Sequence, residues 1–253
     1  MGEAEPFSIS PSALQFQLPI RMVLSGSSGV GKSFFLKELI EKSYYMMNRP
    51  FSAIYYFYVV LNPTIREIAK NPKVILKQGF SLDQISGHDG KSDILCVIDD
   101  HLSRPIYHEL AELFANDSRA KLISICLLTQ NLYTKSGNAG RFNRDILVNR
   151  SHSVVFPCWQ DIAMVQSIAR NSVLDYNRVM AAYNKISHEK DADEFGVASE
   201  SSDEEIDGDD DEYKKRERHS HLVIDFTLSC RAELRLRSKI FFMEEATELF
   251  WPV

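Results

Sequence analysis

A glycine-rich stretch near the start of the chain constrains the fold more than any other feature of the sequence. Residues 23–35 read VLSGSSGVGKSFF, and the segment from Gly26 to Ser33 fits the pattern G-x-x-x-x-G-K-[ST]. In that pattern the glycines allow a tight turn whose backbone N–H groups face phosphate oxygens. The lysine reaches the β- and γ-phosphates and the hydroxyl binds Mg²⁺. The stretch therefore predicts a loop that binds a nucleotide.

The flanking residues have the order that such a loop requires. Residues 20–26 (IRMVLSG) read as a buried strand, and residues 32–47 read as a helix. The apolar residues of that helix fall on one stripe, formed by Phe35, Leu36, Leu39 and Ile40. We expect nucleotide binding from Gly26, Ser27, Ser28, Gly29, Val30, Gly31, Lys32 and Ser33, with Lys32 also catalytic and Ser33 also a metal ligand. An ordinary glycine turn before a helix is the alternative.

Strand-like and helical runs alternate after this loop. Strands are expected at residues 51–60, 73–78, 92–100 and 121–131, and helices at 64–71 and 104–118, the latter with Ile106, Leu110, Leu113 and Phe114 on one face. Continuous apolar strands separated by helices indicate a parallel sheet covered on both faces. The expected fold class is an α/β P-loop NTPase of the ASCE/RecA-like kind, with a mainly parallel central sheet flanked by helices. In such sheets the ligand lies at the carboxyl ends of the strands.

Two aspartates close the apolar run ILCVI in the manner of a Walker B element. Mg²⁺ prefers oxygen ligands and keeps several waters, so one carboxylate near Ser33 suffices to hold it. We assign that role to Asp99, and expect Asp100 to polarise the attacking water. The alternative is that an aspartate here caps the following helix.

The next apolar strand ends in the polar residues of LLTQN. A polar side chain there would lie between the glycine-rich loop and the aspartates, where it could sense the γ-phosphate or orient water. We expect Gln130 to do this, with Thr129 or Asn131 as alternatives, and a simple polar turn as the other interpretation.

A basic loop follows, with Lys135, Arg141, Arg144 and Arg150. It could contact a phosphate backbone, which needs only positive charge. It could instead send one arginine into the nucleotide site of a neighbouring subunit. A solvated basic loop with neither role is the third interpretation.

The net charge of −6 is unevenly distributed. Residues 189–212 hold thirteen acidic residues and one lysine, so the rest of the chain, with 28 basic and 22 acidic residues, carries +6. The acidic segment has few apolar residues and is expected to be disordered. The four cysteines form no C-x-x-C pair, which favours buried thiols in a reducing compartment. No secretory signal or spanning segment is visible, so a soluble intracellular protein is expected.

The chain resembles the viral genome-packaging ATPases of the FtsK–HerA superfamily in segments that occur in the same order. These are VLSGSSGVGKSFFLKELI, ILCVIDD, ISICLLTQNLYTK, RDILVN, SHSVVF, IARN and HLVIDF…AELRLRSKIF, between Ile20 and Phe241. Versions from Maverick/Polinton-type elements and adintovirus-like viruses are most similar, and poxvirus versions less so. The acidic segment has no counterpart in the family, and RDILVNRSH holds one extra residue.

The resemblance implies an oligomeric ring motor that uses ATP and Mg²⁺ to push double-stranded DNA into a preformed capsid. It implies sequence-independent DNA binding, identical neighbouring subunits, and a capsid or portal protein as partners, in the host nucleus, at a viral assembly site or in the virion. Arg144 fits the family's arginine position best, Arg150 is the alternative, and Arg170 falls on another recurrent arginine. DNA contacts are expected from Lys135, Arg141, Arg235 and Arg237.

The implied organisation has four parts: an N-terminal extension at 1–19, an ATPase core at 20–188, an acidic insertion with a basic run at 189–218, and strands at 219–253 that complete the ATPase domain. Two other functions remain open from the residues alone. One is a small-molecule phosphotransferase of the P-loop kinase type. The other is a non-catalytic DNA-binding protein gated by nucleotide.

Overall fold

The computed structural model describes residues 11–85, 87–99, 104–130, 144–158, 161–172, 174–196, 220–241 and 247–250. Within these ranges the strands form one nine-stranded sheet in the order β3-β2-β4-β5-β1-β6-β7-β8-β9. They are β1 (Arg21–Ser25), β2 (Ala53–Tyr58), β3 (Val74–Gln78), β4 (Ile94–Asp99), β5 (Ile123–Thr129), β6 (His152–Val155), β7 (Leu222–Asp225), β8 (Leu236–Ser238) and β9 (Glu248–Leu249).

The sheet is parallel from β3 to β6 and antiparallel from β6 to β9. The predicted α/β fold with a mainly parallel central sheet is therefore confirmed. Strand β5 pairs with β1 on one side and with β4 on the other. This order places the strand that leads into Gln130 between the strand of the glycine-rich loop and the strand that ends in Asp99.

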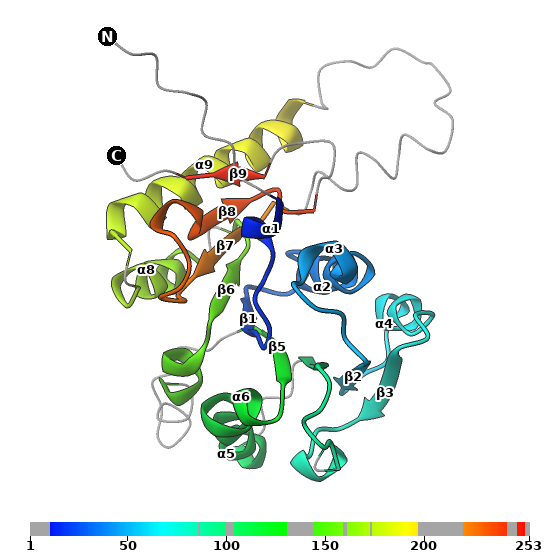
Figure 1. The fold of residues 1–253 in the computed structure, drawn as a ribbon. Coiled ribbons are helices and arrows are strands. Elements are labelled where there is room, and N and C mark those ends of the chain that lie inside the picture. The colour runs from blue at the N-terminus through cyan, green and yellow to red at the C-terminus, as the bar shows by residue number, and fades with distance from the viewer. Residues whose placement is uncertain are drawn as a thin grey trace, which may run out of the picture.

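Helices cover both faces of the sheet (Figure 1). They are α1 (Pro11–Leu14), α2 (Lys32–Glu41), α3 (Ser43–Met46), α4 (Pro63–Ile68), α5 (Arg104–Glu112), α6 (Ser118–Ala120), α8 (Ile162–Arg170) and α9 (Tyr176–Gly196), with an unlabelled helical turn at residues 144–149. Helices α2 and α4 pack on one face, and α5, α8 and α9 pack on the other. None of the helices in the described ranges is both long and apolar enough to cross a membrane.

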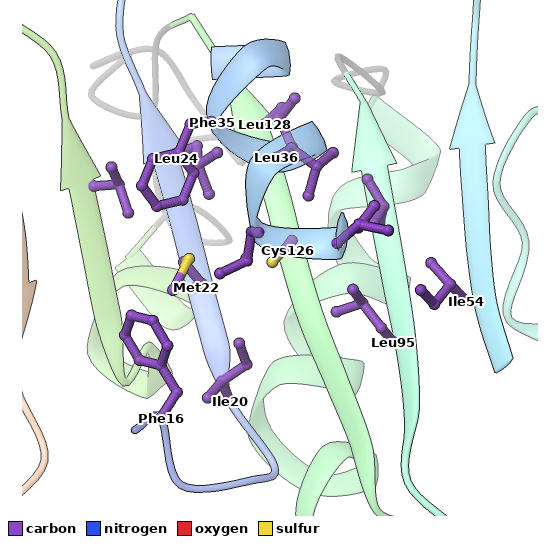
Figure 2. Close-up of a cluster of buried hydrophobic side chains, with 14 of the residues drawn as sticks. Phe16, Ile20, Met22, Leu24, Phe35, Leu36, Ile54, Leu95, Cys126 and Leu128 are labelled. Carbon is purple, nitrogen blue, oxygen red and sulfur yellow. The ribbon is translucent and has the colours of Figure 1, made fainter. Parts of the chain in front are cut away.

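The largest apolar cluster lies between α2 and the centre of the sheet. Figure 2 shows Phe35 and Leu36 of α2 over side chains from β1, β5 and β4. The four residues predicted as the apolar stripe, Phe35, Leu36, Leu39 and Ile40, are all buried. Because burial of a large apolar side chain contributes about 1.5–3 kcal/mol, this stripe holds the start of α2, and with it the glycine-rich loop, against the sheet.

The opposite face is covered in part by α5. Leu110, Leu113 and Phe114 are buried there as predicted, while the side chain of Ile106 lies outside the described residues. The α-helix is shorter than expected, because it ends at Glu112 and continues as one π-helical turn over Leu113–Asp117.

Helix α9 corrects one predicted boundary. Disorder was expected from Glu189, but the helix continues to Gly196. Once a helix is nucleated by packing, each added residue gains a hydrogen bond, so a polar sequence can extend it. The rest of the acidic segment, residues 197–212, lies outside the described residues. Two of the cysteines, Cys96 and Cys126, are buried thiols as predicted, and burial raises the pKa of Cys126 to about 12.

Candidate nucleotide-binding site

The glycine-rich loop and the last residues of β4 and β5 meet at the carboxyl edge of the parallel strands. A cavity of about 690 Å³ lies at this edge. Its walls include Ser28, Gly29, Gly31, Lys32 and Ser33 of the glycine-rich loop, Asp99 at the end of β4, and Thr129 and Gln130 at the end of β5. Eleven residues were predicted at the nucleotide site (residues 26–33, Asp99, Asp100 and Gln130), and seven of them line this one cavity. Gly26, Ser27 and Val30, which were also predicted to bind the nucleotide, are not among the residues that line this cavity.

Two glycines give the loop its turn. Gly29 has a φ of 81° and Gly31 a φ of 107°, both in the left-handed region that costs residues with a Cβ about 1–2 kcal/mol. Gly31 lies directly before α2, so the free N–H groups of the first helical turn begin at the cavity. The loop therefore has the backbone that the sequence pattern predicted.

Lys32 bridges the two ends of the loop. Its Nζ donates hydrogen bonds of 2.7 Å to the carbonyl oxygens of Gly26 and of Ser27. The ammonium group therefore lies at the cavity and is held by the loop's own backbone. A bound triphosphate would offer the same group stronger, charged acceptors.

Asp99 has a partner that the sequence did not suggest. The hydroxyl of Tyr56, on the neighbouring strand β2, donates a hydrogen bond of 2.8 Å to Asp99 Oδ2. Tyr56 is fully buried, and burial together with the Asp99 charge raises the pKa of its phenol above the usual range. The phenol therefore stays protonated and orients the carboxylate. Asp100, the predicted water-polarising residue, lies outside the described residues.

The end of β5 presents two polar side chains. Thr129 is buried, and its Oγ1 has no hydrogen-bond partner within the described residues. Gln130 is exposed at the cavity. An unsatisfied buried hydroxyl costs about 1–3 kcal/mol, so a polar ligand or its water shell in the cavity would relieve that cost. The oxygens of Ser33 and Asp99 are the hard donors that Mg²⁺ prefers. These residues fit a magnesium-bound nucleotide.

A second carboxylate approaches the loop from the other side. Asp161, at the N-cap position directly before α8, accepts hydrogen bonds from the Ser27 N–H (2.7 Å, at Oδ2) and from Ser27 Oγ (3.0 Å, at Oδ1). No motif in the sequence predicts that Asp161 lies at this site. Both polar donors of Ser27 are directed to this carboxylate, so Ser27 anchors the loop.

Two arginines, Arg144 and Arg150, were predicted to reach the nucleotide of a neighbouring subunit, and their side chains differ in exposure. Arg144 is exposed at the start of the helical turn at 144–149. Arg150 is 7% exposed, its guanidinium lies 4.3 Å from the centre of the Phe226 ring, and it donates to the carbonyl of Leu147. The alternative that Arg150 reaches an adjacent nucleotide is therefore wrong, because its side chain is used inside its own subunit.

Two predicted DNA contacts can be placed. Arg237 is only 3% exposed and donates to the carbonyl of Leu14, so its predicted role on a DNA-binding surface is wrong. Arg235 is partly exposed, with its Nε donating to the carbonyl of Cys230. Lys135 and Arg141, like Asn131, lie outside the described residues.

A buried polar cluster explains the position of Arg237. Its guanidinium lies 3.6 Å from Asp225 Oδ2, and Nε2 of His152 lies 3.2 Å from the same oxygen. Although burial alone would raise the pKa of Asp225, His152 and the hydrogen bonds from Thr227 hold that pKa below its usual range. The cluster joins β6, β7 and β8. From the sequence alone, Arg237 was expected on an exposed basic surface.

Comparisons with known proteins give structural likenesses only. No protein-family model and no curated protein matches the chain. Among solved structures it is similar to EssC (ATPases 2 and 3) from Geobacillus thermodenitrificans, at 12% identity and a TM-score of 0.42, over 62% of this chain and 35% of that one. It is also similar to Thermomonospora curvata EccC (ATPases 2 and 3) in complex with a signal sequence peptide, at 14% identity and a TM-score of 0.39, over 57% and 31%.

A third similar structure is the Legionella pneumophila ATPase DotB, at 16% identity and a TM-score of 0.35, over 70% of this chain and 54% of that one. The chain spans about a third to a half of the length of these three proteins.

Proposed function

We propose that the chain is an ATPase that couples hydrolysis of Mg²⁺-ATP to movement of double-stranded DNA, packaging a viral or virus-like genome into a capsid. One structural observation supports the proposal that the chain hydrolyses ATP. The ends of β1, β4 and β5 place Lys32, Asp99 and Gln130 around one cavity, with Gln130 between the other two strands.

The roles follow from the chemistry of each side chain. Lys32 would leave the loop carbonyls for the β- and γ-phosphates, and Ser33 and Asp99 would hold Mg²⁺. The metal would neutralise charge that develops on the phosphates. Gln130 would orient a water toward the γ-phosphate, with Asp100 polarising it. Because phosphoryl transfer depends mainly on positioning and electrostatics, these are the groups of one subunit on which hydrolysis would depend.

The DNA part is supported by the sequence resemblance and by charge. Outside residues 189–212 the chain carries +6, and phosphate contacts give the sequence-independent grip that a translocating motor needs. We propose a ring of identical subunits in which Arg144, exposed on the helical turn at 144–149, reaches the nucleotide of the next subunit. A capsid or portal protein is the proposed docking partner.

A comparison of nucleic acids tests the coupling. We expect long duplex DNA to stimulate ATP hydrolysis more than single-stranded DNA of equal length, without dependence on its sequence. The stimulation should decline steeply between 50 and 200 mM salt, as expected for about 6–10 phosphate contacts. Hydrolysis that no nucleic acid stimulates, at low or high salt, would contradict a DNA motor and favour a small-molecule phosphotransferase or a switch.

A further inference from the structure

We infer that Asp161 is a positioning residue of the proposed nucleotide site, which holds the first turn of the glycine-rich loop in the shape that receives phosphate. The inference rests on the proposed function, because it concerns the same loop. It adds a residue 134 positions away from the loop residue that it contacts.

The contact uses both carboxylate oxygens of Asp161, together with the backbone N–H and the hydroxyl of Ser27. Asp161 Oδ2 accepts the Ser27 N–H at 2.7 Å, and Oδ1 accepts the Ser27 hydroxyl at 3.0 Å. Hydrogen bonds to an ionised carboxylate are about twice as strong as neutral ones. Two of them from one residue fix both the position and the orientation of the loop backbone at Ser27.

The carboxylate of Asp161 does not cap its own helix. Asp161 occupies the N-cap position of α8 but makes no side-chain hydrogen bond to that helix. Asn62, in the same position at the start of α4, does cap its helix, accepting the Ile65 N–H at 2.9 Å. Aspartate is among the best N-cap residues, so the side chain of Asp161 is committed to the loop at the expense of its helix.

Lys32 holds the same two residues from their carbonyl side. Its bonds to the carbonyls of Gly26 and Ser27 are lost when the ammonium group turns to a phosphate. The bonds to Asp161 do not involve the ligand and remain. Asp161 thus keeps Ser27 in place while the lysine changes partners.

Cys158, whose carbonyl accepts the Asp161 N–H at 3.0 Å, is itself anchored. The hydroxyl of Tyr183 on α9 donates to the carbonyl of Cys158 at 2.9 Å and accepts the Cys158 N–H at 3.0 Å. Tyr183 is 3% exposed. The loop also approaches closely, since a Cβ added at Gly26 would lie 3.5 Å from Asp161 Oδ2. The backbone at Asp161 is therefore linked to α9 through Cys158.

Positioning and simple electrostatics predict opposite signs for the loss of this side chain. A carboxylate beside a phosphate site repels the ligand, so its removal would tighten binding if charge alone mattered. If Asp161 shapes the loop, its removal weakens binding, because the ligand must then order the loop itself. A measurement of nucleotide affinity therefore distinguishes a positioning role from a purely electrostatic effect.

Calorimetric titration of the full chain with ATP and Mg²⁺ tests this. We expect Asp161→Ala to weaken ATP binding about 10-fold, and Ser27→Ala, which keeps the N–H bond, about 3-fold. Asp161→Asn should retain more affinity than Asp161→Ala, because the amide can accept the Ser27 N–H and donate to its hydroxyl. In hydrolysis assays the loss should appear in KM more than in kcat.

Asp175→Ala is the matched control. Its carboxylate caps α9 by accepting the Arg178 N–H at 2.9 Å, so its loss should lower the melting temperature and leave ATP affinity unchanged. Unchanged or tighter ATP binding by Asp161→Ala, in a folded protein, would overturn the inference. Should that variant not fold, wild-type affinity in Ser27→Ala would overturn it instead. Failure of the unmodified protein to bind ATP would overturn the proposed function as well.

Discussion

The hydroxyl of Tyr56 donates a hydrogen bond of 2.8 Å to Oδ2 of Asp99. The two residues lie on the neighbouring parallel strands β2 and β4, and Tyr56 is completely buried. A donor in that position restricts rotation of the carboxylate at the edge of the cavity. Partners of this kind typically change metal affinity 10–100-fold when they are removed.

Replacement of Tyr56 by phenylalanine should therefore impair magnesium binding. We expect Tyr56→Phe to raise the Mg²⁺ concentration required for half-maximal ATP binding about 10-fold, and to leave binding of ATP without Mg²⁺ unchanged. Titration of Mg²⁺ at fixed ATP measures this. Tyr55→Phe removes a hydroxyl from the adjacent, oppositely facing residue of β2 and serves as the control. Equal increases in the Mg²⁺ concentration required by the two variants would contradict a specific role for the Tyr56 hydroxyl.

The backbone of Gly31 predicts a second effect on binding. Alanine at a φ of 107° is strained, so Gly31→Ala should weaken ATP binding about 10-fold and lower stability by about 1–2 kcal/mol. Gly79→Ala is the control, because Gly79 has a φ of 74° and a Cβ there would meet nothing within 4 Å. It should lower stability similarly and leave ATP affinity unchanged. Equal affinities in the two variants would contradict a specific role for the loop backbone.

The buried cluster around Asp225 should dominate the stability of the antiparallel part of the sheet. Asp225→Ala leaves Arg237 and His152 buried without their carboxylate, which should cost about 3–5 kcal/mol in chemical denaturation. Asp89→Ala removes a carboxylate that pairs with Lys91 at the surface and should change the unfolding midpoint little. A similar small change in both variants would contradict the importance of the cluster.

The same carboxylate predicts how stability depends on pH. The folded-state pKa of Asp225 is held below its usual range, so its contribution is fully present above about pH 4, its ordinary value. The contribution is lost as pH falls below that value toward the folded-state pKa. The difference in unfolding free energy between the unmodified protein and Asp225→Ala should therefore narrow from pH 6 to pH 3. A constant difference would show that Asp225 contributes through packing and not through its charge.

The parts of the site that could be predicted from sequence are those set by local pattern. The glycine-rich loop, the apolar stripe of α2 and the strand before Asp99 each lie in a short segment whose residue order determines its backbone. Their convergence followed from one general rule, that ligands bind at the carboxyl ends of parallel strands. The position of Gln130 at the cavity was predicted by the same rule.

The contacts that were missed join distant segments. Tyr56 and Asp99 are 43 residues apart, and Ser27 and Asp161 are 134 apart. No spacing in the sequence marks either pair, because each depends on strand order and on the course of a connection. The prediction that Arg237 contacts DNA was wrong for a related reason. Its charge suggested an exposed position, and only the pairing of β7 with β8 shows that its side chain lies beside Asp225.

The most direct test of the proposed site compares ATP binding and ATP hydrolysis in the same three proteins. The unmodified chain should bind and hydrolyse ATP in the presence of Mg²⁺. Lys32→Ala should lose tight binding, while Gln130→Ala should bind ATP normally and turn it over about 100-fold more slowly, since misplacement of a reactant can cost on the order of 10²-fold in rate. Equal hydrolysis by the unmodified protein and by both variants would contradict the assignment of the cavity as the catalytic site.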